Sequence, residues 1–294
     1  MSTERRSTVF IILPVHNRRE TTRGFSERLM KQSRGDFVLV LVDDGSTDGT
    51  LEMVREYPFR REICRGDGSL WWAGGLRRGM SRLAAVSPAA DDVVLWANDD
   101  TQLPPDFLEK AVAELAAKGP GVILAVPTVF TDSGRRDEGC FVSDWPHFRF
   151  RDYGSHPERI DCASTRCLLI RYADLQRCGR FRPRLLPHYL SDFEFTIRAC
   201  RRGIRILPAR SVTCSSTEGS TGFQSMSGTS AREILARMFS PKYAANPLSM
   251  FMFILLAAPL QWKIACWTRA LRTFVAAFVL TTIVRRLGRP HTST

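Results

Sequence analysis

The sequence predicts an α/β fold in which a mostly parallel central sheet is flanked by helices on both faces. Short apolar runs alternate with segments of helical periodicity through about residue 126, and this alternation favours parallel strands joined by crossover helices. Acidic pairs follow two of the runs directly, at Asp43-Asp44 and Asp99-Asp100. Because ligands of such sheets bind beyond the carboxyl ends of the strands, these pairs predict a binding edge.

Apolar and β-branched runs carry the strand predictions. The predicted strands cover residues 8–13, 37–42, 62–64, 92–97, 122–126, 167–170 and 204–207. Helical spacing and terminal signals place helices between them. The predicted helices cover residues 18–32, 50–57, 74–86, 104–118 and 192–202. Gly75 and Gly79 weaken the third helix prediction, because glycine is a poor helix former. Residues 128–230 are otherwise less regular than the first half.

The eight cysteines form no CxxC pair and no Cys/His cluster with zinc-finger spacing. In a chain of 294 residues, which is long enough to bury its own core, this predicts reduced packing thiols in a cytosolic protein. Residues 1–8 are polar, so no signal peptide is expected.

The net charge of +12 is concentrated in the C-terminal part of the chain. After Glu233 there are eight Lys and Arg residues and no acidic residue, which leaves a net of +4 for residues 1–233. Apolar stretches at 248–260 and 274–284 lie among these cations. This pattern predicts interfacial helices on an anionic membrane surface. Packing on the rest of the chain and a homodimer contact are the alternatives. Both stretches are shorter than a helix that spans a membrane needs to be. The basic residues lie in no nucleic-acid-binding motif, so no nucleic acid partner is expected.

The acidic pairs suggest chemistry as well as turns. Asp99-Asp100 could hold Mg²⁺ or Mn²⁺, which prefer oxygen ligands, and Asp43-Asp44 could accept hydrogen bonds from a nucleoside. The alternative is turn formation, because Asp, Asn and Gly favour tight turns. No GxxxxGK[ST] or GxGxxG motif is present, which disfavours a P-loop enzyme or a dinucleotide-dependent dehydrogenase.

Five segments together resemble a family 2 glycosyltransferase of the GT-A fold. They are ILPVHNR (12–18), VDDGSTDGT (42–50), GDGSLWWAGG (66–75), WANDDTQLP (96–104) and YLSDFEFTIRACRRG (189–203). The resemblance covers residues 8 to 225, and GDGSLWW is similar to a bacterial rhamnosyltransferase-like subgroup. It implies a catalytic domain over residues 1–230 and a C-terminal helical appendage over 231–294. The catalytic domain would have a nucleotide-binding half at about 8–126 and an acceptor half at about 127–230.

The resemblance also implies roles for individual residues. Asp192 would be the catalytic base, with Glu194 as the alternative. Asp100 would be the first ligand of Mg²⁺ or Mn²⁺ and Asp99 the second. The residues implied around the nucleotide-sugar are Pro14, His16, Asn17, Asp43, Asp44, Gly68, Trp71, Trp72, Arg77, Asn98 and Asp99.

Two departures from the family pattern affect these roles. Relatives often have Asn in the segment after the paired tryptophans, whereas this chain has Arg77-Arg78. These arginines could contact the diphosphate or form a solvated helix face. Residues 211–216 lack the His of many relatives, so Asp100 and the diphosphate would hold the metal alone. His188 could border the acceptor or be structural.

The implied reaction is an inverting transfer of a sugar from a nucleotide-diphospho-sugar to a glycan or lipid-linked acceptor in cell-surface polysaccharide synthesis. A divalent cation stabilises the charge that builds on the leaving diphosphate, and a base activates the acceptor hydroxyl. The expected location is cytoplasmic, peripheral on the inner face of the cell membrane. The alternative is a non-catalytic relative that binds nucleotide-sugars or scaffolds a membrane complex.

Overall fold

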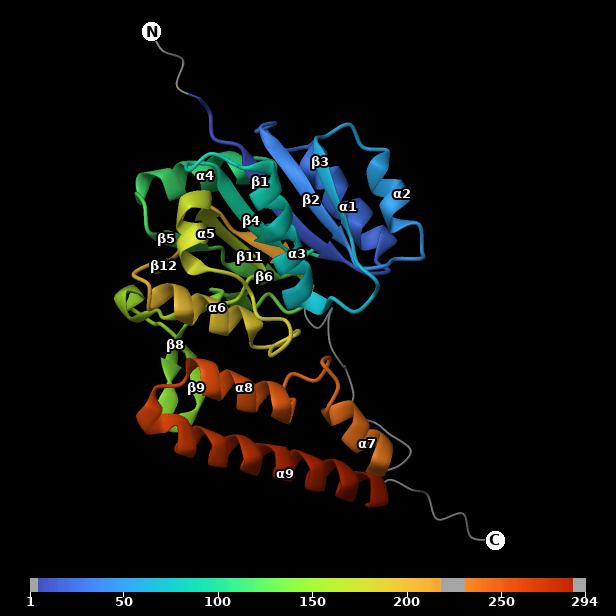
Figure 1. The fold of residues 1–294 in the computed structure, drawn as a ribbon, viewed down its shortest axis with the longest axis vertical. Helices are drawn as coiled ribbons and strands as arrows, with labels where there is room; N and C mark the ends of the chain where they lie inside the picture. The colour runs from blue at the N-terminus through green and yellow to red at the C-terminus, as the bar shows by residue number, and fades with distance from the viewer. Residues whose placement is uncertain (1–4, 218–230, 288–294) are drawn as a thin grey trace.

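The computed structural model describes residues 5–217 and 231–287. Its centre is a seven-stranded sheet of order β12-β5-β11-β4-β1-β2-β3 (Figure 1). The strands are β1 (Val9–Val15), β2 (Phe37–Asp43), β3 (Arg61–Arg65), β4 (Val93–Ala97), β5 (Val122–Ala125), β11 (Cys167–Arg171) and β12 (Arg205–Pro208). Only β11 runs antiparallel to its neighbours in this sheet, against β4 and β5. The predicted mostly parallel sheet is therefore confirmed.

Helices cover both faces of this sheet, as the alternating pattern predicts. They are α1 (Arg19–Met30), α2 (Thr50–Arg55), α3 (Trp71–Val86), α4 (Phe107–Ala117), α5 (Tyr172–Cys178) and α6 (Ser191–Cys200). Successive strand residues point to opposite faces. Ile11 accordingly packs in a core cluster with residues of α1, α2 and α4, whereas Ile12 packs in a second cluster with residues of α3, α5 and α6.

Helix α3 begins earlier than predicted and contains three buried glycines. A Cβ atom at Gly79 would lie 2.5 Å from Ile12 Cγ2, and one at Gly75 would lie 2.8 Å from Pro14 Cβ. The glycines thus let the helix approach β1 closely. Their low helix propensity weakens the prediction, but the tertiary contact outweighs it.

The less regular middle of the chain forms two small sheets. One contains β8 (Cys140–Asp144), β9 (Arg149–Asp152) and β10 (Cys162–Ala163). The other contains β6 (Thr128–Phe130), β7 (Arg136–Asp137) and β13 (Cys214–Ser216). Short 3₁₀ turns lie at Trp145–His147, Pro157–Arg159 and Leu260–Trp262. All eight cysteines are free, and all but Cys200 are buried, which agrees with the predicted packing thiols.

The C-terminal layer consists of α7 (Ala231–Met238), α8 (Pro247–Ala257) and α9 (Lys263–Leu287). Helix α8 lies between α6 and α9, and the β8–β9 hairpin reaches down to both α8 and α9 (Figure 1). Phe253 of α8 is fully buried, with ring contacts to Trp145, Phe148 and Phe150. Within residues 5–217 and 231–287, no helix is long and apolar enough to cross a membrane.

Candidate active site

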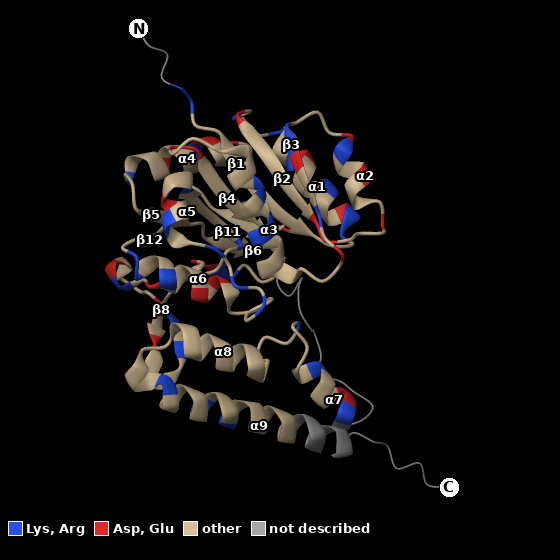
Figure 2. Cartoon of the chain, viewed as in Figure 1, with Lys and Arg blue, Asp and Glu red and all other residues tan. Residues whose placement is uncertain are grey.

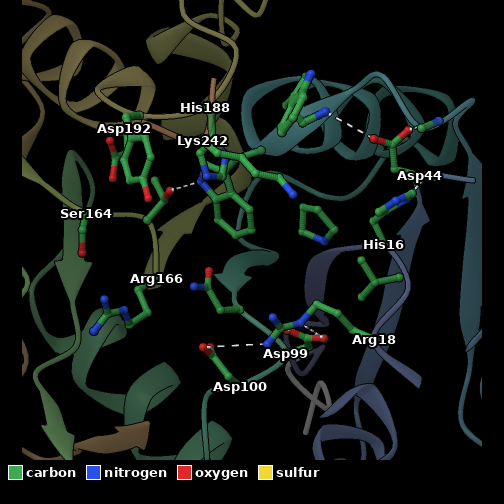
Figure 3. A pocket seen from close by; sticks show the side chains of 18 residues that line it. His16, Arg18, Asp44, Asp99, Asp100, Ser164, Arg166, His188, Asp192 and Lys242 are labelled. Carbon is green, nitrogen blue, oxygen red and sulfur yellow. Dashed lines mark hydrogen bonds and ion pairs between the residues drawn. The ribbon is translucent and has the colours of Figure 1, made fainter. Parts of the chain in front are cut away.

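A cavity of about 510 Å³ opens at the carboxyl ends of β1, β2 and β4, where the acidic pairs predict a binding edge (Figure 3). Its lining comes from seven separate parts of the chain. The lining residues are Pro14, Val15, His16, Arg18, Asp44, Gly68, Trp71, Trp72, Asn98, Asp99, Asp100, Ser164, Thr165, Arg166, His188, Tyr189, Asp192 and Lys242. Most of the residues that the family resemblance implies are therefore gathered in one place.

Asp44 holds one wall of the cavity in position. Its Oδ1 accepts a hydrogen bond from the Gly68 amide at 2.9 Å, and its Oδ2 accepts one from the Leu70 amide at 2.9 Å and one from the Trp71 amide at 3.3 Å. Gly68 has φ +90°, a conformation that favours glycine. His16 Nδ1 donates to the Asp44 carbonyl at 2.6 Å. Since charge-assisted bonds to backbone amides are strong, this carboxylate orders the 66–71 loop.

Asp43 and Asn17 do not line the cavity. Asp43 Oδ1 accepts from the Ser46 amide at 3.1 Å, and Asn17 Oδ1 accepts from the Thr47 amide at 2.8 Å. The backbone N–H of Asn17 in turn donates to Ser46 Oγ at 2.9 Å. Asp43 therefore stabilises the turn after β2, which is the turn-forming alternative that the sequence allows. Asn17 fixes this turn against the turn after β1.

Asp99 is held by an arginine. Arg18 Nε donates to both carboxylate oxygens of Asp99, at 2.8 and 2.9 Å, and Thr22 Oγ1 donates to Oδ2 at 3.0 Å. Burial raises the pKa of the Asp99 carboxyl, and Arg18 and Thr22 oppose this shift. Because its oxygens already accept three hydrogen bonds, the geometry does not favour Asp99 as a second metal ligand, and Asp100 is the better candidate.

Asp100 fits a metal site that is completed by the substrate. Its side chain lines the cavity and is 10% exposed, and its Oδ2 lies 3.9 Å from Arg18 Nη2. Among the residues that the structure describes, no group of three or more His, Cys, Asp or Glu side chains is arranged to hold a metal ion. One carboxylate together with substrate phosphates is, however, a common way to bind Mg²⁺. Neighbouring Asn98 also lines the cavity, and its backbone N–H donates to the Arg166 carbonyl at 3.0 Å.

The two acidic residues of α6 occupy different environments. Asp192, in the first turn of the helix, lines the cavity, and burial raises the pKa of its carboxyl to about 6. Glu194 is 3% exposed and forms ion pairs with Arg198 at 2.8 Å and Arg182 at 3.6 Å. Glu194 does not line the cavity, so the geometry favours Asp192 over the alternative base.

Trp71 and Trp72 both reach the cavity, although the sequence leaves open which one does. Trp72 Nε1 donates to Thr165 Oγ1 at 2.9 Å, and the Trp71 ring meets the His188 ring edge-on with centroids 6.1 Å apart. Arg77, by contrast, is exposed on α3 and does not line the cavity. The solvated-face alternative therefore describes Arg77 better than a diphosphate contact.

Sequence reasoning assigns no role to several lining residues. They are Arg18, Ser164, Thr165, Arg166, Tyr189 and Lys242. Arg18 lies inside the ILPVHNR segment, which is the only local signal for it. Residues 164–166 lie in the irregular middle section, and Lys242 belongs to the C-terminal appendage, so neither has a pattern that ties it to the acidic pairs. His188, for which the sequence leaves an acceptor-side role and a structural role open, also lines the cavity.

Comparison with known proteins gives a consistent result. The family model described as "Glycosyl transferase family 2" matches residues 10–179. An undecaprenyl-phosphate 4-deoxy-4-formamido-L-arabinose transferase of Pseudomonas fluorescens strain Pf0-1 is 32% identical over 135 residues, and that of strain SBW25 is 30% identical. Each alignment covers 44% of this chain and 38% of the relative's own length.

Solved structures share the fold at low sequence identity. TarS 1–349 of S. aureus in complex with UDP has a TM-score of 0.56 and 18% identity, with 90% of this chain and 70% of that chain covered. The mannosyltransferase PcManGT of Pyrobaculum calidifontis, in complex with GDP-Man and Mn²⁺, has a TM-score of 0.55 and 18% identity, with 98% and 82% covered. These likenesses confirm the predicted GT-A fold.

Proposed function

The chain belongs to glycosyl transferase family 2, and we propose that it is an inverting glycosyltransferase. It would transfer a sugar from a nucleotide-diphospho-sugar to a glycan or lipid-linked acceptor in cell-surface polysaccharide synthesis. The observation that carries the proposal is one cavity that combines Asp100, beyond the end of β4, with Asp192, at the start of α6. Asp100 would hold the cation that stabilises a leaving diphosphate, and Asp192 would be the base that an acceptor hydroxyl needs.

The donor side of the cavity would bind the nucleotide-sugar. The 66–71 loop held by Asp44 and the turn around His16 form the wall where the nucleoside would lie. Asp100 would hold Mg²⁺ or Mn²⁺ together with the diphosphate; the bound cation would stabilise the negative charge of the leaving group. Arg18, fixed by Asp99, adds a positive charge 3.9 Å from the Asp100 carboxylate.

The acceptor side would use Asp192 as a general base. A carboxylate with a pKa of about 6 is mostly ionised at neutral pH and is a stronger base than an ordinary aspartate. Asp192 would take the proton of the acceptor hydroxyl while that oxygen bonds to the anomeric carbon and the bond to the diphosphate breaks. The electron pair of that bond leaves with the diphosphate. A single displacement of this kind inverts the anomeric centre.

The comparisons support parts of this proposal. The printed names of the curated relatives identify undecaprenyl-phosphate as their substrate, which favours a lipid-linked acceptor. Mn²⁺ in the PcManGT complex and in a GalNAc-T7 complex favours a divalent cation. The similarity of GDGSLWW to rhamnosyltransferase-like proteins makes rhamnose one donor sugar to test.

We further propose that the C-terminal layer rests on an anionic membrane surface. Large apolar side chains of α8, the following turn and α9 are exposed: Leu248, Phe251, Leu255, Leu260, Ile264, Leu271, Val275, Val279 and Leu280. Lys263, Arg269 and Arg272 lie on α9, and α8 and α9 are otherwise mostly uncharged (Figure 2). Apolar side chains flanked by cations suit the interface of a bilayer with anionic headgroups.

The test of the enzymatic proposal begins with donor binding. The full-length protein is screened by thermal shift against UDP-, GDP- and dTDP-sugars, rhamnose included, with and without Mn²⁺ or Mg²⁺. A donor that binds the native state raises the melting temperature, and sugar transfer to lipid extracts is then measured. Asp192→Asn is expected to keep donor binding and to lose transfer by about 10²–10⁴-fold, the usual contribution of a general base.

The control is Asp132→Asn, which changes the same type of side chain at an exposed position outside the cavity; it is expected to transfer normally. Near-normal transfer by folded Asp192→Asn contradicts the proposed base. Donor binding by wild-type protein without transfer or hydrolysis would favour the non-catalytic alternative.

A further inference from the structure

Lys242 brings a positive charge from the C-terminal layer into the cavity. It lies between α7 and α8, and its side chain extends into the cavity near His188 (Figure 3). All other lining residues come from positions 14–192 of the chain. Asn246 Nδ2 donates to the Phe239 and Ser240 carbonyls at 2.7 and 3.0 Å. These bonds close the loop that carries Lys242.

The charge of Lys242 has no counterion among the described residues, since no carboxylate there forms an ion pair with its ammonium group. Of the two other cations of the cavity, Arg18 binds Asp99 at 2.8 Å. The Arg166 guanidinium lies over the Phe130 ring at 4.9 Å, and its buried Nη1 has no hydrogen-bond partner among the described residues. Lys242 and Arg166 are therefore the cavity cations available to a ligand anion, and only Lys242 is exposed and comes from the C-terminal layer.

His188 does not supply a compensating charge. Burial, and to a smaller extent the charge of Lys242, lower the pKa of its imidazole to about 4, so it is neutral at pH 7. A neutral ring beside a primary ammonium leaves this part of the cavity positive. A phosphate group offers several oxygen acceptors for such an ammonium, and charge-assisted bonds of this kind are strong.

The position of Lys242 indicates which substrate carries the anion. Figure 3 shows His188 and Asp192 on one side of the cavity and His16 and Asp44 on the other. The proposed nucleoside wall is the His16–Asp44 side. In a single displacement the acceptor enters from the side of the base, opposite the leaving diphosphate. An anion between Asp192 and the C-terminal layer therefore belongs to the acceptor.

We propose that Lys242 binds a phosphate group of the acceptor, so that the acceptor is a phosphorylated lipid or a lipid-linked sugar phosphate. This inference rests on the proposed glycosyl transfer, because it assigns the substrate class of the same site. The exposed apolar side chains of α8 and α9 belong to the layer that carries Lys242. A lipid tail held at that layer would place its phosphate close to the 239–246 loop.

The test uses geranyl phosphate as the probe and geraniol as its uncharged counterpart. Wild-type protein is expected to bind the phosphate at least about tenfold more tightly than the alcohol in calorimetry, because only the phosphate forms a charge-assisted bond. Lys242→Met is expected to lose this preference, and Lys242→Arg to retain it. Lys118→Met removes the same charge at an exposed position on the end of α4 and is expected to behave as wild type.

A second measurement separates the acceptor from the donor as the source of the phosphate. Binding of UDP with Mn²⁺ is expected to change less than about twofold in Lys242→Met, since only the acceptor contact is lost. Tenfold weaker UDP binding with unchanged geranyl phosphate binding assigns Lys242 to the donor and overturns the proposal. Equal binding of geranyl phosphate and geraniol by the wild type, or no effect of Lys242→Met, also overturns it.

These binding measurements need no turnover, so they are independent of the enzymatic test. If no nucleotide-sugar is bound or transferred but geranyl phosphate binding depends on Lys242, the proposed function fails while the phosphate site stands. Melting curves of the variants check folding; Lys242 is exposed, so its substitution is expected to leave the fold intact.

Discussion

Asp192 and Glu194 have different surroundings, although they are two residues apart on α6. Glu194 is buried against Arg198 and Arg182, and this pairing keeps its charge compensated inside the fold. Asp192 has no such partner among the described residues and loses hydration on burial, which raises the pKa of its carboxyl to about 6. A raised pKa at a cavity wall is typical of catalytic groups.

The raised pKa predicts the pH dependence of transfer. The base acts in its ionised form, so kcat/KM is expected to fall about tenfold per pH unit below pH 6 and to level off above it. The rate is measured from pH 4.5 to 8.5 at saturating cation, with circular dichroism to confirm folding across the range. A rate that stays constant down to pH 4.5 would contradict Asp192 as the titrating base.

At the scale of the elements, α8 links the C-terminal layer to the helix that carries Asp192. Phe253 and Ile197 belong to one buried cluster, and partly buried Phe193 packs against it. Phe150 bridges the two helices, with its ring 4.6 Å from the Phe193 ring and 5.7 Å from the Phe253 ring. Close packing of this kind transmits displacements, so the position of α6 depends on α8.

Phe253→Ala is expected to weaken this junction. Removing a fully buried phenylalanine costs about 3–5 kcal/mol when the cavity does not collapse. The melting temperature in differential scanning calorimetry is therefore expected to fall clearly, and transfer activity with it. The matched control is Leu255→Ala on the same helix, whose side chain is 43% exposed. Equal melting temperatures for the two variants would show that α8 does not stabilise the catalytic unit.

At the scale of the whole molecule, charge and apolar exposure are distributed unevenly. Figure 2 shows acidic and basic residues interspersed around the central sheet, whereas the C-terminal layer is mostly uncharged, with a few cations and one acidic residue, Glu233, on α7. Leu260 is 84% exposed and Ile264 is 74% exposed. Such exposure of large apolar side chains marks an interaction surface rather than ordinary solvent-facing structure.

Vesicle flotation tests the proposed membrane contact. The protein is expected to float with phosphatidylcholine vesicles that contain 30% phosphatidylglycerol, more weakly with neutral vesicles, and less at high salt, which screens the headgroup charge. Leu260→Glu with Ile264→Glu is expected to abolish flotation. Met30→Glu, at a 47% exposed position on α1, is the control. Absence of flotation with dimers in light scattering would assign the layer to a homodimer contact instead.

The sequence predicted the central sheet because its signals are local. Buried strands such as 37–42 are continuous apolar runs, and the acidic pairs follow their strands directly. The site was predictable where a residue lies inside a specific motif, as Asp44 and Asp100 do. It was not predictable for Arg166 or Lys242, because no local pattern records that a side chain from another part of the chain reaches the same cavity.

The amino-acid sequence by itself determined the fold class, the family resemblance and the basic, apolar character of the C-terminal part, since composition, periodicity and motif order are properties of the chain. Tertiary structure decided which polar side chains reach the cavity. It paired Asp99 with Arg18, bonded the Asp43 side chain to the turn after β2 and left Arg77 exposed to solvent, and it brought Lys242 beside His188. The physical reason is that hydrogen-bond partners, burial and pKa depend on neighbours that only folding brings together.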